Sequence, residues 1–491
     1  MIKFYKIPDE YFQRIHFVRP RFKSNIENVL LYMANECCKI EDCQCEEYKE
    51  RITKAIRMFP GNLTVTDKTI SNWRTEIPAL FAFYEEDKAT GITKTSKSAH
   101  FLHDYQDLTQ FFRFFLSTFQ LPGGHLKAKD NLELIQRGVK FKPARYIVNV
   151  LLEGNALLSE SGSEKEMSLS AEEATYCILN DLRVTTGKRS PRKTAELILK
   201  NRKEKLKYRN PKDEQTFSLK GTPRTKGDVT RYAADILDYM EIASLLQKEN
   251  RYYYLAPNQE KSIKALASES TYFTGYDSLY IDPNLNIKQV ADKEIDWFQY
   301  VNENLNPDKF KTDVTTLISS GETIAVIIEE RIKEIVTSED TTKKDVGNIG
   351  ETLVHGHEIA RLQIAGYPDL AKLVQIVDSP SYHPGFDIDS FEGDEKAIHR
   401  YIEVKTTISK QKLQIFSFHM SPNEWSVAET HRNHYYVYRL TLSAKDKVLY
   451  ILKNPVGLYK TDKIEASPRN GMEITFDATK FKTTELLTCA N

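Results

Sequence analysis

The chain has 491 residues, a length that predicts about three domains, more than one hydrophobic core can serve. Hydrophobic residues make up 40% and charged residues 28% of the sequence, which excludes a mostly disordered, collagenous or disulfide-stapled protein. The 69 basic and 69 acidic residues cancel, so the total charge gives no reason to expect a nucleic acid, a membrane or an acidic substrate as a partner.

Apolar runs in the sequence stay short of the roughly 18 residues that a membrane helix needs. The first ten residues also lack the apolar centre of a signal peptide. We therefore expect a cytoplasmic protein that does not contact a membrane.

Four of the six cysteines lie close together, namely Cys37, Cys38, Cys43 and Cys45. Such a cluster is compatible with zinc, but it lacks a second Cys-x-x-Cys or a histidine pair at zinc-finger spacing. The spacing therefore favours ordinary reduced thiols at a helix end over a zinc site.

We expect a first, winged-helix-like DNA-recognition domain over residues 1–158. A Thr66-Asp67 cap predicts a short helix within it. The exposed positions of this helix would carry Lys68, Asn72 and Arg74. Asn and Arg fit base edges in the major groove, although a single polar helix face is more often only solvated. Phenylalanines at helical spacing over 111–119 indicate a buried helix rather than a base-stacking surface.

Residues 159–166 are small and polar and indicate a linker. Ser170 and Glu173 then form a capping box, which starts a second domain over residues 167–275. The stretch from 187 to 226 carries fourteen Lys or Arg against four acids, a net charge of plus ten. A protein that neutralises phosphates needs such a charge, so the stretch favours DNA contact. The alternative is a basic face that is only solvated.

The second domain also shows the order helix, turn, helix, hairpin that is typical of a winged helix. Residues 228–247 predict a helix with an apolar face, and residues 251–255 predict a strand before a Pro257-Asn258 turn. We therefore expect this domain to bind DNA. The basic candidates for that contact are Lys188, Arg189, Arg192, Lys193, Arg224 and Lys226.

A helical connector is predicted over residues 276–344. It contains an apolar-rich helix over 323–336 and a polar break over 337–344. The last domain then spans residues 345–491.

Two segments of the last domain contain candidate catalytic residues. Residues 385–391 contain Asp387, and residues 400–407 contain Glu403 and Lys405. Alternate side chains of a strand share a face, so Glu403 and Lys405 would project together while their neighbours are buried. An antiparallel partner strand carrying Asp387 would add a second carboxylate beside them.

Two carboxylates and a lysine on one side of a sheet suit phosphodiester hydrolysis. Mg²⁺ prefers such oxygen ligands, with Mn²⁺ as an alternative metal. Lys405 would orient the attacking water and stabilise the negative charge that develops. Exposed strands also often alternate Glu and Lys, so by spacing alone an ordinary solvated strand is the alternative.

Five motifs, in this order and spacing, give the last domain a family resemblance. They are Asn-Ile-Gly-Glu at 348–351, Gly-Phe-Asp-Ile at 385–388, Tyr-Ile-Glu-Val-Lys-Thr-Thr at 401–407, Ser-Pro-Asn-Glu-Trp at 421–425 and Tyr-Tyr-Val-Tyr-Arg at 435–439. They resemble the nuclease-like domain at the C-terminus of the plant NO VEIN protein, which is similar to the PD-(D/E)xK superfamily of type II restriction endonucleases. The resemblance covers about a quarter of the chain, roughly residues 340 to 455.

The resemblance implies that Asp387 and Glu403 are metal ligands and that Lys405 is the catalytic lysine. It also implies that Glu351 is the acidic residue of the first helix. Asn348 and Glu351 form a capping pair as well, so a purely structural role for Glu351 has equal weight.

This chain departs from the superfamily in one respect. The superfamily often places proline directly before the aspartate, whereas Gly385 and Phe386 separate Pro384 from Asp387. Asp389, one pleat further on the same face, is the alternative ligand.

Taken together, the predicted fold is multi-domain, with mainly α winged-helix-like N-terminal and middle domains. An α/β PD-(D/E)xK-like domain with a mixed central sheet follows. The predicted function is a Mg²⁺-dependent restriction-type endonuclease that cuts double-stranded DNA, with a homodimer as the expected means of cutting both strands. The alternatives are a DNA-binding regulator with an inactive nuclease-like domain and an RNA-directed nuclease.

Overall fold

The computed structural model divides the chain into two compact units. The first unit takes residues from 1–23, 40–99 and 109–310, and the second from 24–39, 100–108 and 311–491. The structure describes residues 3–16, 26–59, 62–124, 126–208, 226–257, 259–305, 346–377, 384–394, 396–409, 413, 416–443, 447–468 and 471–487.

The N-terminal half of the first unit combines helices with a small antiparallel sheet in which β4 pairs with both β2 and β3. Phenylalanines of α5 are buried, which confirms the buried helix expected over 111–119. Thr66 caps α3 by accepting a hydrogen bond from the Thr69 amide, as the sequence predicts. The elements are β1 (Phe4–Tyr5), η1 (Asp9–Tyr11), β2 (Cys43–Gln44), α2 (Cys45–Met58), α3 (Asp67–Arg74), η2 (Thr75–Ala79), β3 (Tyr84–Glu86), β4 (Ile92–Thr95), α5 (Leu108–Thr118) and α6 (Ala128–Gln136).

The later part of the first unit is also largely helical and contains the predicted hairpin. Ser170 and Glu173 form both hydrogen bonds of the expected capping box. The strand expected over 251–255 pairs antiparallel with the strand before it, and the helix predicted over 228–247 ends at Ile242 because the hairpin begins at Leu246. The elements are α7 (Pro143–Glu160), β5 (Leu169–Ser170), α8 (Ala171–Ala174), η3 (Thr175–Leu179), α9 (Leu182–Thr185), α10 (Pro191–Lys203), β6 (Lys207–Tyr208), α12 (Lys226–Ile242), β7 (Leu246–Glu249), β8 (Tyr252–Leu255), α13 (Glu260–Ser268), η4 (Thr274–Ile281), α14 (Ile287–Ala291) and α15 (Glu294–Glu303).

A mixed six-stranded sheet in the order β17-β14-β13-β11-β10-β9 is the centre of the second unit. Strands β11 and β13 pair in parallel and are joined by a crossover that contains α20, whereas the neighbouring pairs are antiparallel. The elements are α1 (Ile26–Cys38), α4 (Lys97–Tyr105), α18 (Val346–Ile364), α19 (Pro368–Ala371), β9 (Gln375–Ile376), β10 (Ile388–Phe391), β11 (His399–Ser409), β12 (Phe416–Met420), α20 (Pro422–His431), η6 (Arg432–His434), β13 (Tyr435–Ser443), β14 (Lys447–Lys453), α21 (Pro455–Lys460), β15 (Glu465–Pro468), β16 (Met472–Phe476), η7 (Ala478–Lys480) and β17 (Thr483–Thr484).

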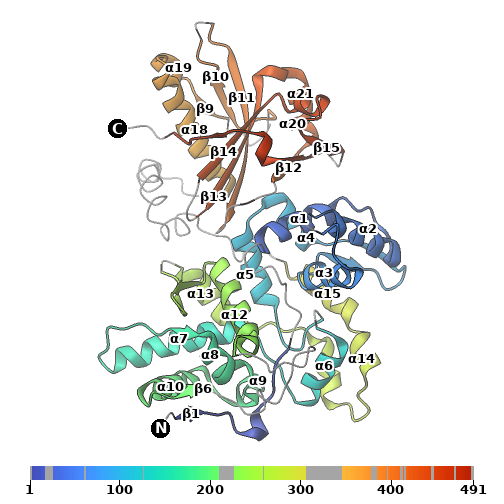
Figure 1. Ribbon diagram of the computed structural model, residues 1–491, viewed down its shortest axis with the longest axis vertical. Helices are drawn as coiled ribbons and strands as arrows, with labels where there is room; N and C mark the ends of the chain where they lie inside the picture. Colours follow the sequence, from blue (N-terminus) through green and yellow to red (C-terminus); the bar gives the residue numbers. More distant parts are fainter. Residues whose placement is uncertain are drawn as a thin grey trace. The chain divides into compact units, whose positions relative to one another are not determined.

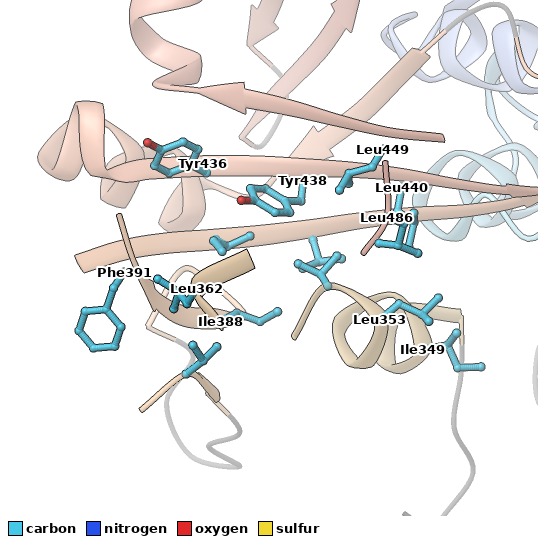
Figure 2. Packing of buried hydrophobic residues seen from close by; sticks show 14 of the residues in the cluster. Ile349, Leu353, Leu362, Ile388, Phe391, Tyr436, Tyr438, Leu440, Leu449 and Leu486 are labelled. Carbon is cyan, nitrogen blue, oxygen red and sulfur yellow. The ribbon is translucent and has the colours of Figure 1, made fainter. Parts of the chain in front are cut away.

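Helices cover the central sheet from two sides, with α18 on one side and α20 on the other (Figure 1). Ile349 and Leu353 of α18 belong to one buried cluster with Ile402 and Val404 of β11 (Figure 2). Alternation along β11 therefore sends Glu403 and Lys405 to the opposite face, the one toward α20.

The observed architecture confirms a multi-domain protein of mixed α/β structure with a mixed sheet near the C-terminus. The winged-helix and PD-(D/E)xK assignments, like the four domain boundaries, stay predictions. The helix expected over 323–336 and the break over 337–344 lie outside the described residues. No helix within the described ranges is both long and apolar enough to cross a membrane.

Candidate active site

The antiparallel pairing of β10 and β11 brings Asp387 beside Glu403. Ile388 pairs with Ile402, and the Asp387 amide donates to the Ile402 carbonyl at 2.9 Å. The Asp387 carboxylate accepts a hydrogen bond from the Val404 amide at 2.7 Å, which fixes the side chain against β11. The partner strand expected for Asp387 is therefore present.

Gly385 allows the turn before Asp387 to lie close to α20. Its φ of +87° is one that residues with side chains rarely adopt. A Cβ atom at this position would also approach the Val427 side chain to 2.7 Å. The Tyr435 hydroxyl donates to the Gly385 carbonyl at 2.8 Å and holds the turn in place.

Glu403 and Lys405 project from the same face of β11, as alternation predicts. Lys405 Nζ lies 2.6 Å from Glu403 Oε1, and only 3% of Glu403 is exposed. The Lys405 carbonyl accepts a hydrogen bond from Arg439 on β13, which anchors the strand next to the lysine. The structure therefore brings Asp387, Glu403 and Lys405 together.

A third carboxylate, for which the sequence indicates only a structural role, completes the cluster. Glu424 Oε2 lies 3.0 Å from Lys405 Nζ. Glu424 is the third residue of α20 and forms a capping box with Ser421. The Ser-Pro-Asn-Glu-Trp motif is typical of a helix start, but the contact with β11 depends on the crossover between β11 and β13.

The electrostatics of the cluster are dominated by burial. Burial raises the pKa of Glu403 well above its ordinary value, and Asp387 and Glu424 raise it further, against the influence of Lys405. Burial alone lowers the pKa of Lys405, but Glu403 and Glu424 outweigh it and the net shift is upward. The lysine is therefore protonated, while the charge of Glu403 is costly in the absence of a second cation.

Glu403 and Asp387 offer suitable donors for a hard divalent cation. Glu403 Oε2 is buried and accepts no hydrogen bond from the described part of the protein. An unused, water-excluded carboxylate oxygen next to a second carboxylate fits Mg²⁺, which binds oxygen and keeps several waters. Among the described residues, no three His, Cys, Asp or Glu side chains are grouped so as to hold a metal by themselves.

Glu351 comes from the helix on the other side of the sheet. It is half-buried on α18, which begins at Val346, so Asn348 lies inside the helix rather than at its cap. The backbone therefore does not support a capping role for Glu351. The catalytic role stays a prediction.

Asp389, the alternative ligand, already has a partner. Its Oδ1 lies 2.7 Å from His399 Nδ1. The pairing with β11 places Asp389 opposite Tyr401, one pleat away from Asp387 and Glu403. This position favours Asp387 as the ligand.

The candidate DNA-contact residues of the first helix differ in exposure. Lys68 is exposed on α3, while Asn72 and Arg74 are half-buried. Ile70 and Trp73 bury the opposite side of the helix. Helix α3 therefore has a polar face that contains Lys68, Asn72 and Arg74.

The basic candidates near α10 fall into two groups. Lys188 and Lys193 are exposed, whereas Arg189 pairs with buried Asp181 at 2.8 Å and Arg192 pairs with Glu160 at 2.6 Å. Arg224 lies outside the described residues, as does the side chain of Lys226. The two exposed lysines are thus the better candidates for phosphate contacts.

The four clustered cysteines form no disulfide bond. Cys37 and Cys38 are buried in α1, and Cys43 and Cys45 are partly exposed around the start of α2. Cys38 Sγ lies 3.5 Å from His100 Nδ1. The expectation of ordinary thiols rather than zinc stays a prediction.

The fold and the site together define a multi-domain protein of the mixed α/β class. Residues 5–298 match the family model described as Restriction endonuclease BpuJI, N terminal. Because this match covers more than half of the 491 residues, the chain belongs to this restriction endonuclease family.

A second family model, described as Protein NO VEIN, C-terminal, matches residues 350–452. This match confirms the resemblance noted from the sequence motifs. A solved structure that is similar to the chain is the crystal structure of pyrene- and phenanthrene-modified DNA in complex with the BpuJ1 endonuclease binding domain. It has 22% sequence identity and a TM-score of 0.49, and the similarity covers 60% of this chain and 99% of that one. No curated protein matches the chain.

Proposed function

We propose that the chain is a restriction-type endonuclease that hydrolyses phosphodiester bonds of double-stranded DNA with the help of Mg²⁺. The observation that carries the proposal is the cluster of Asp387, Glu403 and Lys405 on one face of β10 and β11. Membership of a restriction endonuclease family supports a DNA substrate.

In the proposed mechanism, Asp387 and Glu403 hold the metal. Bound Mg²⁺ would polarise the phosphoryl oxygen and lower the pKa of a bound water. Lys405, held beside Glu403, orients the attacking water and stabilises the negative charge that develops on the phosphoryl group. Burial of Glu403 strengthens these interactions because little water competes for the same atoms.

DNA binding is assigned to the first unit in this proposal. The exposed lysines Lys188 and Lys193 would contact phosphates, and Lys68 and Asn72 would lie closest to base edges. One active-site cluster in each chain cuts one strand, so a homodimer or two successive nicks would cut both. We also propose that the enzyme cuts only DNA that carries either a specific sequence or modified bases.

The experiment that tests the proposal offers the full chain a broad panel of nucleic acids with Mg²⁺ or with EDTA. The panel contains unmodified duplex DNA, methylated duplex DNA and single-stranded RNA. We expect Mg²⁺-dependent cleavage of duplex DNA that Glu403→Gln abolishes. Binding without cleavage of any member would contradict the enzyme and indicate a regulator, and preferential cleavage of RNA would contradict a DNA substrate.

A further inference from the structure

We propose that Glu424 is a positioning residue that holds Lys405 in place for the reaction. This inference rests on the proposed function. Lys405 Nζ lies between two carboxylates, 2.6 Å from Glu403 Oε1 and 3.0 Å from Glu424 Oε2. The two acids come from different elements, Glu403 from β11 and Glu424 from α20.

The lysine needs a second partner because Glu403 is also the proposed metal ligand. A carboxylate that coordinates Mg²⁺ shares its negative charge with the metal and attracts a neighbouring ammonium group less strongly. With Glu403 as the sole partner, metal binding would loosen Lys405 at the moment when its position matters. Glu424 keeps a full carboxylate on the other side of the ammonium group.

Glu424 itself is held rigidly. Its Oε2 accepts a hydrogen bond from the Ser421 amide at 3.0 Å, and its own amide donates to Ser421 Oγ at 3.2 Å. Pro422 at the first position of α20 fixes the start of the helix. The atom that bonds the lysine is therefore also part of the helix cap, which leaves the side chain little rotational freedom.

The capping box provides a variant that separates the two roles of Glu424. Glutamine also serves at the third position of a capping box, so Glu424→Gln keeps the cap and removes only the charge that faces Lys405. Ser421→Ala is the matched control, because it weakens the same cap and leaves the Glu424 carboxylate in place. Both variants are made in the full chain.

Two measurements test the inference. The first, made with Mg²⁺ present, is the side-chain ammonium resonance of Lys405 in protein labelled with ¹⁵N-lysine, assigned by its loss in Lys405→Arg. We expect this resonance to be sharp in the unmodified protein and in Ser421→Ala, and to be broadened or lost in Glu424→Gln. The second is the split between kcat and KM for cleavage. We expect Glu424→Gln to lower kcat on the order of 10- to 100-fold with KM unchanged, and Ser421→Ala to leave kcat within about twofold.

An unchanged Lys405 resonance in Glu424→Gln would overturn the inference, whether or not the protein cuts DNA. A protein that never cuts would defeat the proposed function, while the resonance would still decide whether Glu424 holds the lysine. If Glu424→Gln instead raises the Mg²⁺ concentration for half-maximal rate about tenfold or more and leaves kcat unchanged at saturating Mg²⁺, Glu424 is a metal ligand and the positioning role is wrong.

Discussion

Gly350 lies where α18 packs tightly against Thr406 of β11. A Cβ atom at this position would lie 1.7 Å from Thr406 Oγ1 and 2.8 Å from Thr406 Cβ, so an alanine does not fit without movement of the helix. Thr406 directly follows Lys405, so that movement would reach the active-site strand. Close approach, rather than backbone flexibility, explains the glycine in the Asn-Ile-Gly-Glu motif.

We predict that Gly350→Ala destabilises the second unit by about 1–3 kcal/mol, the usual effect of overpacking. Thr406→Ala removes the atom that clashes most and should recover part of this loss in the double variant. Chemical denaturation, monitored by hydrogen exchange of the β11 amides, measures the loss of stability in Gly350→Ala and its recovery in the double variant. Equal stability of Gly350→Ala and the unmodified protein would show that the helix can shift without loss.

The sequence predicts that Asp387, Glu403 and Lys405 lie close together, which the structure shows, but it does not predict the contact of Glu424 with Lys405. Strand alternation is a local property, so Glu403 and Lys405 can be assigned to one face, and a pairing partner for Asp387 can be expected. The capping box explains Glu424 completely from its own helix. Its second role depends on a contact between residues 19 positions apart in the chain, which no local pattern indicates.

At the scale of elements, Glu358 joins α18 to three strands of the central sheet. Its carboxylate is fully buried and accepts hydrogen bonds from Arg361, from Ser390 of β10 and from Tyr438 of β13. Arg400 of β11 lies 3.7 Å away. Burial alone raises the pKa of Glu358, but Arg361 and Arg400 outweigh burial and the net pKa lies below the ordinary value.

Because its pKa is lowered in the folded state, Glu358 makes the stability of the second unit depend on pH. The unfolded chain has a glutamate pKa of about 4.3. Above that pH the folded state gains the full contribution of the charged carboxylate, and the contribution is lost as the pH falls through the lower pKa of the folded state. The second unit should therefore become less stable in acid, in part through this residue.

We predict that Glu358→Gln lowers the stability of the second unit at neutral pH by about 3–5 kcal/mol, because Arg361 is left without a carboxylate and Arg400 keeps only Glu392. The variant should also lose less additional stability than the unmodified protein between pH 5 and pH 3, an interval of about two units around the unfolded pKa. Hydrogen exchange of β10 and β13 at both pH values measures the difference. Parallel losses in the two proteins would show that Glu358 does not contribute to the acid sensitivity.

Sequence patterns predict single elements better than their arrangement. The caps of α3 and α8 and the hairpin after α12 follow from local chemistry and are confirmed. The apolar pattern places the end of α12 too late because the pattern continues into β7. Only the pairing of β7 with β8 shows that this segment is a strand. Strand order in the central sheet depends on contacts distant in sequence.

At the scale of the whole molecule, the net charge of zero conceals an uneven distribution. The plus-ten stretch from 187 to 226 belongs to the first unit, while the carboxylates of the proposed metal site belong to the second. Total charge alone gives no reason to expect a nucleic acid, because acidic residues elsewhere in the chain offset the basic stretch. Charge resolved along the chain is consistent with the proposed phosphate contacts of the first unit and the proposed metal site of the second.

We predict that exchanging Lys188 and Lys193 for alanine weakens duplex DNA binding and flattens its salt dependence. Each phosphate that the variant no longer neutralises should reduce the slope of log affinity against log salt by roughly 0.9. Fluorescence anisotropy in EDTA over a range of salt concentrations measures this slope. The control variant replaces the exposed Lys261 and Lys264 of α13, and an equal loss of affinity in that variant would argue against a specific role for Lys188 and Lys193.

The proposed function requires that the cluster around Lys405 cuts DNA. The most direct measurement compares the cleavage rates of the unmodified protein and Lys405→Ala at saturating DNA and Mg²⁺, with DNA affinity measured separately in EDTA. We expect Lys405→Ala to keep its DNA affinity and to cut at a rate reduced by a factor on the order of 100 or more. Equal cleavage rates in the two proteins would contradict it.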